Sequence, residues 1–586
     1  MKFSVPVEVQ QISAPVVGEN GFQALNTRSE VLPAGWAAPG SKKKLTCDIL
    51  VEHDVPIVVR DGATLYTDVF RPVNSSEKVP ALICWSPFGK KFSGKDSLNL
   101  MVPWNLGLPQ DALSGLEKFE APDPADWVAN GYAIINPDAR GTGNSGGMMA
   151  VHGTQEAEDG YDVIEDIAKR DWCNGSVGLA GNSHLAIIQW FIAALNPPSL
   201  KAIAPWEGCG DLYREQFARG GIYSGDLFDN LIVKYMLKGN HGLESIREMY
   251  KKYPLANDYW NDKRPDMKKI KIPTYITGTW TNSMHGMGAI RGWLEVESKE
   301  KWLRWHGTQE WYDLWGNKDG QVELASFFDR YLKGLDNGWE STPRVRMAVL
   351  RFGEKDPISN IVEDDFPMSR TRYERLFLQS EGKLSLEGPA AKADSVSYDS
   401  EHASDKIQFV HKFDKTTHIV GMTKAVLHMS CADADDLDVY VLIRKLSASG
   451  EELFNLNIPW SGVPVSKIAE ISDKIRSEVI MYAGPTGILR ASRRKIDPAR
   501  SIHENWPYHP HDEEQKVEPN TIVRLDIGIW ATGIEFEAGE SIALQVSGHH
   551  MGMTGPFTTN DHSRNKGRHF VHFGGEYDSH LVVPVV

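Results

Sequence analysis

In the first part of the chain, short apolar runs alternate with stretches of helical spacing. Residues 80–85 and 132–136 are apolar runs of strand length, and a helical stretch at 160–169 precedes the next apolar run at 177–182. Strands that alternate with helices along a chain are typical of a parallel sheet with helices on both faces. The pattern therefore predicts an α/β core.

The alternation stops between residues 210 and 268, which are polar and aromatic, show helical patterning and contain no predicted strand. We interpret this segment as a helical cap inserted over the carboxyl edge of the sheet. The core then consists of residues 46–209 and 269–350. Residues 1–45 contain Pro-Gly and Pro-Ala-Gly turns and no regular spacing of apolar residues, so we expect an irregular extension on the surface.

The last part of the chain has a different pattern. Short runs with alternating apolar residues recur, for example at 425–429, 437–443 and 542–546, and Gly, Pro and Asp turns separate them. Many short strands with turns between them are typical of a β-sandwich or jelly roll. We therefore predict an all-β jelly-roll domain over residues 351–586.

Composition and charge narrow the class of protein. A chain of 586 residues is too long for one core. Its net charge of −15 disfavours nucleic acids and anionic membranes as partners. The five cysteines are scattered without CxxC spacing, as expected for reduced thiols. There is no run of 18 apolar residues and no apolar signal sequence at the start, so we expect a cytoplasmic protein.

The chemistry centres on Ser183. The apolar run 177–182 ends in a Gly-Asn-Ser turn, and the helix-forming run 185–195 follows directly. A strand, a tight turn and a helix with serine at the apex form a nucleophile elbow, which aims the hydroxyl and the backbone N–H of His184 at one point. Ala186 replaces the second small residue of this motif. An ordinary strand-to-helix turn with a serine cap is the alternative interpretation.

Other polar clusters give weaker signals. His285 lies near a predicted helix N-terminus and could point into the site, although a structural role is the simpler interpretation. His509 and His511 have no third ligand at metal-binding spacing. The glycine-rich turn at 141–147 lacks the pattern of a phosphate-binding loop. We therefore expect no metal and no cofactor.

Four stretches carry a resemblance to a known family. They are DARGTGNS at 138–145, WCNGSVGLAGNS at 172–183, FFDRYLKG at 327–334 and GILRAS at 487–492. Together they resemble motifs of the cocaine esterase-like (CocE/NonD) hydrolases, the X-prolyl dipeptidyl aminopeptidases and the α-amino-acid ester hydrolases. The resemblance implies an α/β-hydrolase core, a helical cap and a C-terminal jelly roll, but a fold does not settle a function.

The site departs from the family at the positions that carry chemistry. The family places its oxyanion tyrosine after a proline in the first loop, where this chain has Phe88, and it follows its nucleophile with tyrosine rather than His184. The family's acid position falls on Asn282, in the stretch that also contains Trp280. The position of its basic histidine falls on Glu310.

Three functions fit these residues. In the first, His306 replaces the missing base, with Glu310 or Asp313 orienting it, and the protein is a serine hydrolase. In the second, Ser183, Asn282 and Glu310 form an acid–base site without an acyl-enzyme, as in a lyase, isomerase or cyclase. In the third, the site is inactive and the protein is a binding module.

We favour a hydrolase with an atypical base that acts on a small ester or amide with an aromatic or acyl portion. The candidate catalytic residues are Ser183, Glu310, His306 and Asn282, and the candidate oxyanion and substrate-binding residues are His184, Phe88, Trp280, Trp305 and His285. The aromatic surroundings of Glu310 should bury its carboxyl and raise its pKa towards neutrality. The alternative is a surface glutamate paired with Arg304 or with a lysine. The expected partner is a small-molecule substrate, and a homodimer is left open.

Overall fold

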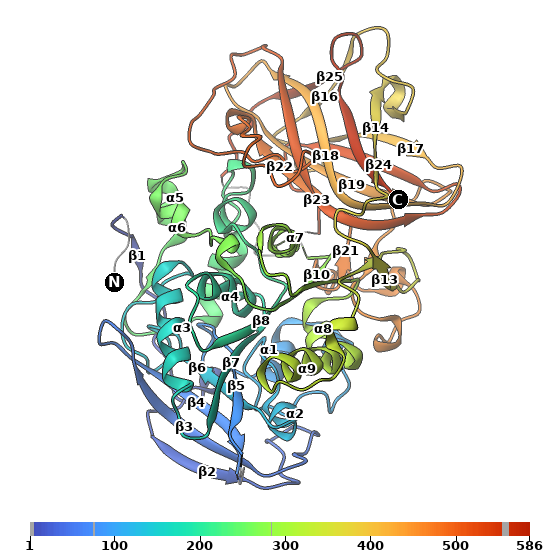
Figure 1. Cartoon of the computed structure of the whole chain (residues 1–586). Coiled ribbons are helices and arrows are strands. Elements are labelled where there is room, and N and C mark those ends of the chain that lie inside the picture. Colours follow the sequence, from blue (N-terminus) through green and yellow to red (C-terminus); the bar gives the residue numbers. More distant parts are fainter. Residues whose placement is uncertain (1–4, 74–76, 283, 554–561) are drawn as a thin grey trace.

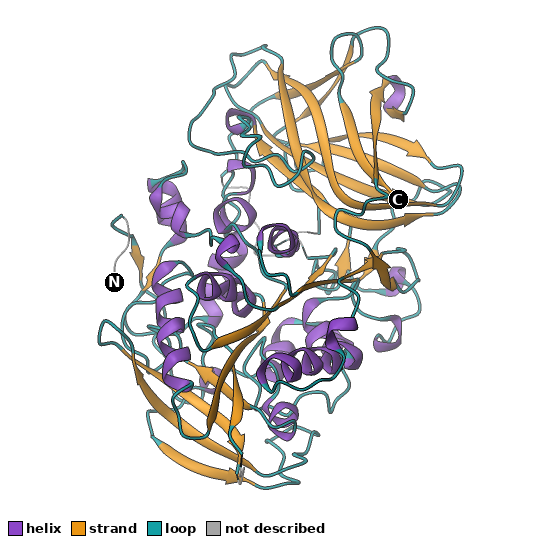
Figure 2. Cartoon of the chain, viewed as in Figure 1, coloured by secondary structure: helices purple, strands orange, loops and turns teal. Residues whose placement is uncertain are grey.

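The computed structural model describes residues 5–73, 77–282, 284–553 and 562–586, and two large sheets dominate it (Figure 1). Helices gather around the first sheet, whereas the second part is made mainly of strands (Figure 2). The strands of the first sheet, in spatial order, are β13 (Ile358–Glu363), β12 (Val345–Val349), β11 (Lys301–His306), β10 (Thr274–Thr279), β8 (Leu200–Trp206), β7 (Cys173–Asn182), β5 (Val79–Ile83), β6 (Ala133–Pro137), β4 (Thr64–Pro72), β3 (Ile49–Val58) and β2 (Arg28–Leu32).

The centre of the first sheet is parallel. From β6 through β5, β7, β8, β10 and β11 to β12, each neighbouring pair of strands runs in the same direction. β5, β6 and β12 consist entirely of buried residues, as expected for strands covered on both faces. The predicted α/β core is therefore confirmed. Because the strands are parallel, the loops that follow them meet at one edge of the sheet.

Helices cover both faces of this sheet (Figure 1). They are α1 (Gly94–Met101), α2 (Pro124–Ala129), α3 (Thr154–Ile167), α4 (His184–Ala194), α7 (Gly286–Glu295), α8 (Glu310–Trp315) and α9 (Lys318–Leu332). Gly160 of α3 lets α4 approach closely, since a Cβ there would lie 2.3 Å from the Ile192 side chain. No helix among the described residues combines the length and apolar character that a membrane crossing needs.

The N-terminal segment contributes to two sheets, which corrects the expectation of an irregular extension. β2 adds an antiparallel edge strand to β3. β1 (Val9–Gln10) pairs with β9 (Leu243–Glu244), so the insertion also contains a short strand that was not expected. The residues of β2 are almost all exposed, and an edge strand without a buried face gives no alternating pattern to read.

The segment between β8 and β10 is otherwise built from short helices and lies between the first sheet and the C-terminal part (Figure 1). Its helices are η3 (Leu212–Phe217), η4 (Arg219–Gly221), η5 (Phe228–Met236), α5 (Ile246–Lys252), α6 (Asp258–Asp262) and η6 (Met267–Lys269). Side chains cap several of them. Asp211, Ser245 and Asn257 each accept a hydrogen bond from a backbone N–H of the first turn.

The C-terminal part is a second sheet that closes on itself. In spatial order its strands are β16 (Asp394–Asp399), β25 (Arg568–Phe573), β18 (Thr417–Cys431), β23 (Val523–Phe536), β22 (Thr486–Arg490), β19 (Asp438–Leu446), β24 (Ser541–Ser547), β17 (Lys406–Lys412), β15 (Lys383–Ser385), β14 (Arg372–Gln379) and β26 (His580–Val585). β26 also pairs with β18, and this pairing closes the sheet into a barrel. The predicted all-β character of this part is confirmed.

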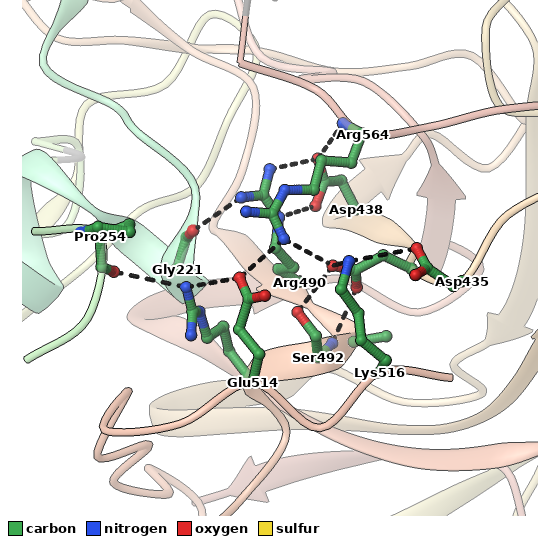
Figure 3. A network of polar contacts seen from close by, with 12 residues as sticks. Gly221, Pro254, Asp435, Asp438, Arg490, Ser492, Glu514, Lys516 and Arg564 are labelled. Carbon is green, nitrogen blue, oxygen red and sulfur yellow. Dashed lines mark hydrogen bonds and ion pairs between the residues drawn. The ribbon is translucent and has the colours of Figure 1, made fainter. Parts of the chain in front are cut away.

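The GILRAS stretch connects the C-terminal part to the insertion (Figure 3). Arg490 donates two hydrogen bonds to the Asp438 carboxylate at 2.6 and 2.9 Å, and its third nitrogen donates to the backbone oxygen of Gly221 at 3.3 Å. Arg493 reaches the backbone oxygen of Pro254 in the same way. Buried bidentate pairs fix orientation more than they add stability. Arg490 and Arg493 therefore tie the insertion to the C-terminal part.

Candidate active site

Ser183 lies at the apex of a strained turn between β7 and α4. Its backbone has φ 53° and ψ −118°, a combination that residues other than glycine rarely adopt. Gly181 precedes it with φ 129°, and a Cβ there would lie 2.5 Å from the Leu185 side chain. A Cβ added to Gly208 would lie 2.9 Å from the Ala186 Cβ, so these two residues pack closely. The predicted strand, turn and helix are therefore confirmed, with Ala186 as the second small residue.

His285 faces this serine. Its Nε2 lies 3.2 Å from Ser183 Oγ, and its ring is buried. Burial lowers the pKa of His285 to about 3, so the imidazole is neutral across the physiological range. Its Nδ1 has no hydrogen-bond partner among the described residues. The structure thus brings a neutral ring nitrogen to the hydroxyl.

Asn282 positions the backbone ahead of this histidine. Its Oδ1 accepts hydrogen bonds from the N–H groups of Met284 and His285, at 2.9 and 3.2 Å. An asparagine oxygen engaged in this way stabilises the turn into α7. Asn282, at the family's acid position, therefore contacts the backbone of His285. In the described structure it makes no hydrogen bond to the His285 ring.

His306 points to different partners. It ends β11, and its Nε2 lies 2.6 Å from Glu207 Oε1 and 3.5 Å from Asp313 Oδ2. Its Nδ1 lies 3.2 Å from the Thr308 hydroxyl. Both nitrogens therefore have partners other than Ser183. Asp313 in turn forms a buried ion pair with Arg304, which excludes the interpretation that Arg304 neutralises a surface Glu310.

Glu310 is buried, as predicted, and its pKa lies well above the ordinary value. Burial is the main cause, and the neighbouring carboxyls of Glu120 and Glu207 raise the pKa further. The backbone oxygen of Glu310 accepts a hydrogen bond from Asn182 Nδ2 at 3.0 Å, which ties the start of α8 to the end of β7. The predicted burial and the direction of the pKa shift are both confirmed.

Two further glutamates at this site were not predicted. Glu207 directly follows β8, and its position at the carboxyl edge of a parallel strand is a signal that could have identified it. Its backbone oxygen accepts the Ser183 N–H, and its Oε2 accepts the Thr279 N–H. Glu120 lies in an irregular loop before α2, and no motif marks it. Its backbone oxygen accepts the Asn182 N–H at 3.0 Å.

His184, the residue after Ser183, belongs to a buried cluster of histidine rings and a glutamate. His184 Nε2 lies 2.9 Å from Glu156 Oε1, which also accepts a hydrogen bond from Trp85 Nε1. The ring of His152 stacks on that of His184 at 3.8 Å between centroids, with 27° between the planes. Ligand atoms of His152, Glu156 and His184 lie within 4.8 Å of one another. Because the lone pairs of nearly parallel rings do not converge on one point, this arrangement favours a hydrogen-bonded support over a metal site.

The predicted aromatic residues divide into two groups. Phe88 is buried and packs edge-on against Phe119 at 5.3 Å and beside the His184 ring at 6.0 Å, so it contacts the elbow. Trp280 and Trp305 stack on each other at 4.0 Å and are also buried. Trp280 Nε1 donates to the backbone oxygen of Ala348, which places this pair in the core near β12.

The fold and the strained serine define the class as an α/β-hydrolase with a C-terminal β domain. Residues 61–240 match the family model of the X-Pro dipeptidyl-peptidase (S15 family), and residues 337–582 match the C-terminal non-catalytic domain of X-Pro dipeptidyl-peptidase. A crystal structure of a CocE/NonD family hydrolase from Staphylococcus aureus is 30% identical, covers 96% of this chain and 97% of its own, and superposes with a TM-score of 0.84. The chain belongs to the CocE/NonD family and is a serine hydrolase of the S15 type.

Curated relatives agree with this placement. A cocaine esterase from Rhodococcus sp. (strain MB1 Bresler) is 22% identical over 623 residues, covering 92% of this chain and 98% of the relative. A Xaa-Pro dipeptidyl-peptidase from Lactobacillus helveticus (strain DPC 4571) is 29% identical over 247 residues, covering 34% of this chain and 30% of that protein. The first similarity extends along almost the whole of both chains, and the second is local.

Proposed function

We propose that the protein hydrolyses a small ester or amide through an acyl-enzyme, with Ser183 as nucleophile and His285 as general base. The observation that carries this proposal is the 3.2 Å separation of Ser183 Oγ and His285 Nε2 at a strained elbow. A general base must lie within hydrogen-bond reach of the proton that it removes, and His285 meets this condition. His306 has Glu207 and Thr308 as its partners instead.

The reaction follows from this geometry. Ser183 Oγ bonds to the carbonyl carbon while its proton passes to His285 Nε2, and the carbonyl π electrons move onto the oxygen. Collapse of this intermediate expels the alcohol or amine, which takes the proton from His285. A water molecule then attacks the acyl-enzyme, again with His285 as base, and releases the carboxylic acid and free Ser183. The His184 N–H supplies one hydrogen bond to the oxyanion.

His285 works without the carboxylate that usually orients such a base. Its Nδ1 has no partner among the described residues, and its place at the start of α7 adds the positive end of a helix dipole. Both features disfavour the imidazolium that forms in the transition state. Removing the function of the acid from a protease triad lowers kcat by about 10⁴-fold. We therefore expect slow turnover, with esters of good leaving groups as the best substrates.

The surroundings of Ser183 indicate an apolar or aromatic acyl group. Phe88, Phe119 and Trp311 form a continuous set of ring contacts beside the elbow, with Phe119 and Trp311 centroids 5.5 Å apart. Aromatic walls with a few polar groups are typical of small-molecule sites. We propose further that the insertion between β8 and β10 acts as a cap over this site and that the β domain has jelly-roll topology.

A non-hydrolytic reaction is the second candidate, because the buried carboxyls of Glu120, Glu207 and Glu310 lie near one another at this site. Burial, with the neighbouring carboxyls of Glu120 and Glu207, raises the pKa of Glu310, and neutral carboxylic acids can move protons in an isomerase or lyase. Such a reaction would proceed without an acyl-enzyme. The two candidates therefore differ in one observable species.

Detection of that species tests the proposal. The protein is mixed with p-nitrophenyl butyrate, quenched in acid and examined by mass spectrometry of the intact chain and its peptides. We expect a burst of p-nitrophenol and a butyryl group on the peptide that contains Ser183, because a good leaving group makes acylation faster than deacylation. Turnover of the ester without any adduct on Ser183 would contradict an acyl-enzyme mechanism at this residue.

A further inference from the structure

The oxyanion site lacks a side-chain donor at the place where the resemblance implies a tyrosine. Phe88 occupies that position and has no hydroxyl. The His184 N–H is one donor, but stabilising a tetrahedral oxyanion generally takes at least two. The ring of Phe88 packs on Phe119, and the next residue in the chain is Glu120. The loop that contains Phe119 and Glu120 therefore lies where a second donor is needed.

Glu120 is held directly against the elbow. Its backbone oxygen accepts the Asn182 N–H, and Trp311 Nε1 donates to its Oε1 at 3.2 Å. Its carboxyl lies close enough to the Ser183 hydroxyl and the His184 N–H for both to influence its pKa. Its Oε2 is buried and makes no hydrogen bond of ordinary length and angle with the described residues. Trp311 thus anchors one carboxyl oxygen, and the carboxyl as a whole lies against the Ser183 hydroxyl and the His184 N–H.

The charges around Glu120 favour a neutral carboxyl. Burial raises the pKa of Glu120 to about 8, and only the neighbouring donors of Trp311, Ser183 and His184 oppose the rise. The neighbouring Glu310 carboxyl interacts with that of Glu120, and two close carboxyls disfavour a negative charge on both.

The other titratable groups nearby have partners of their own or carry no charge. Glu207 is paired with His306 at 2.6 Å, and the buried ring of His285 is neutral. Lys118, two residues before Glu120, donates to the backbone oxygens of Ser86 and Pro137. A neutral carboxylic acid has one O–H to donate.

We propose that Glu120 is a catalytic residue whose protonated carboxyl donates a hydrogen bond to the oxyanion, beside the His184 N–H, and so replaces the tyrosine hydroxyl. The substrate carbonyl oxygen takes the position next to the His184 N–H, and the Glu120 O–H turns towards it. This inference rests on the proposed acyl-enzyme mechanism. A carboxylic acid kept neutral by an apolar site is an effective donor of this kind.

The proposal fixes the sign of the pH dependence. Below its pKa, Glu120 is neutral and donates; above it, Glu120 is a carboxylate that repels the developing oxyanion, so activity falls as pH rises through about 8. If Glu120 were instead the general base, activity would rise over the same range. His285 stays neutral down to about pH 3, so its titration adds no acid limb between pH 5 and 7.

The test compares Glu120→Gln, Glu120→Ala and the matched control Glu310→Gln. For each, kcat/KM for p-nitrophenyl acetate is measured from about pH 5.5 to about pH 9.5. The native enzyme should lose activity above its alkaline pKa. Glu120→Gln keeps an N–H donor at every pH and should remove this fall, whereas Glu120→Ala should lower kcat/KM about 10²-fold at neutral pH and also remove it. Glu310→Gln should retain the fall.

The outcomes separate this inference from the proposed function. An unchanged alkaline fall in Glu120→Gln, or a native profile that rises with pH, would overturn the role of Glu120 while butyrylation of Ser183 left the hydrolase mechanism intact. Loss of the fall in Glu310→Gln alone would transfer the donor role to Glu310 and overturn the inference in the same way. Absence of any Ser183 adduct in the native enzyme would instead remove the mechanism on which the inference rests. A merely structural role for Glu120 would not change the shape of the profile.

Discussion

Replacing Ser183 with alanine is expected to lower kcat for p-nitrophenyl butyrate by about 10²-fold or more, because a site that already lacks the acid keeps only part of a full triad's advantage, and the variant keeps only the binding and oxyanion contributions. The residual activity of Ser183→Ala should not fall further when His285 is also replaced, because no serine hydroxyl is left for His285 to activate. The measurement is steady-state hydrolysis, with the melting temperature as the check that the variant folds. A loss smaller than tenfold would remove Ser183 as the nucleophile.

A glycine variant at the same position separates catalysis from strain. Ser183 has φ 53° and ψ −118°, and such a conformation costs about 1–3 kcal/mol for a residue with a Cβ. Ser183→Gly should therefore be as inactive as Ser183→Ala but unfold at a higher temperature. If glycine brought no gain in melting temperature over alanine, the turn would not be storing strain.

The second large effect is expected at His285. His285→Gln should lower kcat/KM by about 10²-fold, because the glutamine amide cannot take the proton that leaves Ser183. The glutamine side chain is polar and of similar length, so the turn held by Asn282 should survive. The measurement is kcat/KM for p-nitrophenyl butyrate at neutral pH.

His306→Gln is the matched control. Its amide can still donate to Glu207, which His306 Nε2 contacts at 2.6 Å, so the expected loss is less than tenfold. A reversed order, with His306→Gln severe and His285→Gln mild, would show that the side chains rearrange on substrate binding and that His306 is the base.

Much of the fold could be predicted because local pattern and tertiary structure agree. Strands β5 and β6 are buried and mostly apolar, the second half of β7 is buried, and the turn into α4 has the small residues that it needs. β2 was missed because its residues are almost all exposed and show no alternation. The pairing of β1 with β9 joins segments more than 200 residues apart, and neither is longer than two residues.

The site could be predicted only in part. The resemblance placed a base after β11, where Glu310 begins α8, whereas the histidine that contacts Ser183 comes from the loop after β10. Both loops leave the same edge of the sheet, so the sequence located the edge but not the side chain that reaches the serine. Glu120 could not be found in this way, since its loop has no motif and its position depends on a backbone contact to Asn182.

The rate at which a fluorophosphonate labels Ser183 is the most direct test of the Ser183–His285 pair. Only a serine that a base activates reacts rapidly with this reagent, and labelling requires no assumption about the natural substrate. We expect the native chain to be labelled on the peptide containing Ser183, His285→Gln to react about 10²-fold more slowly or worse, and His306→Gln to stay within tenfold of native. Labelling that is unaffected by His285→Gln but abolished by His306→Gln would contradict the account.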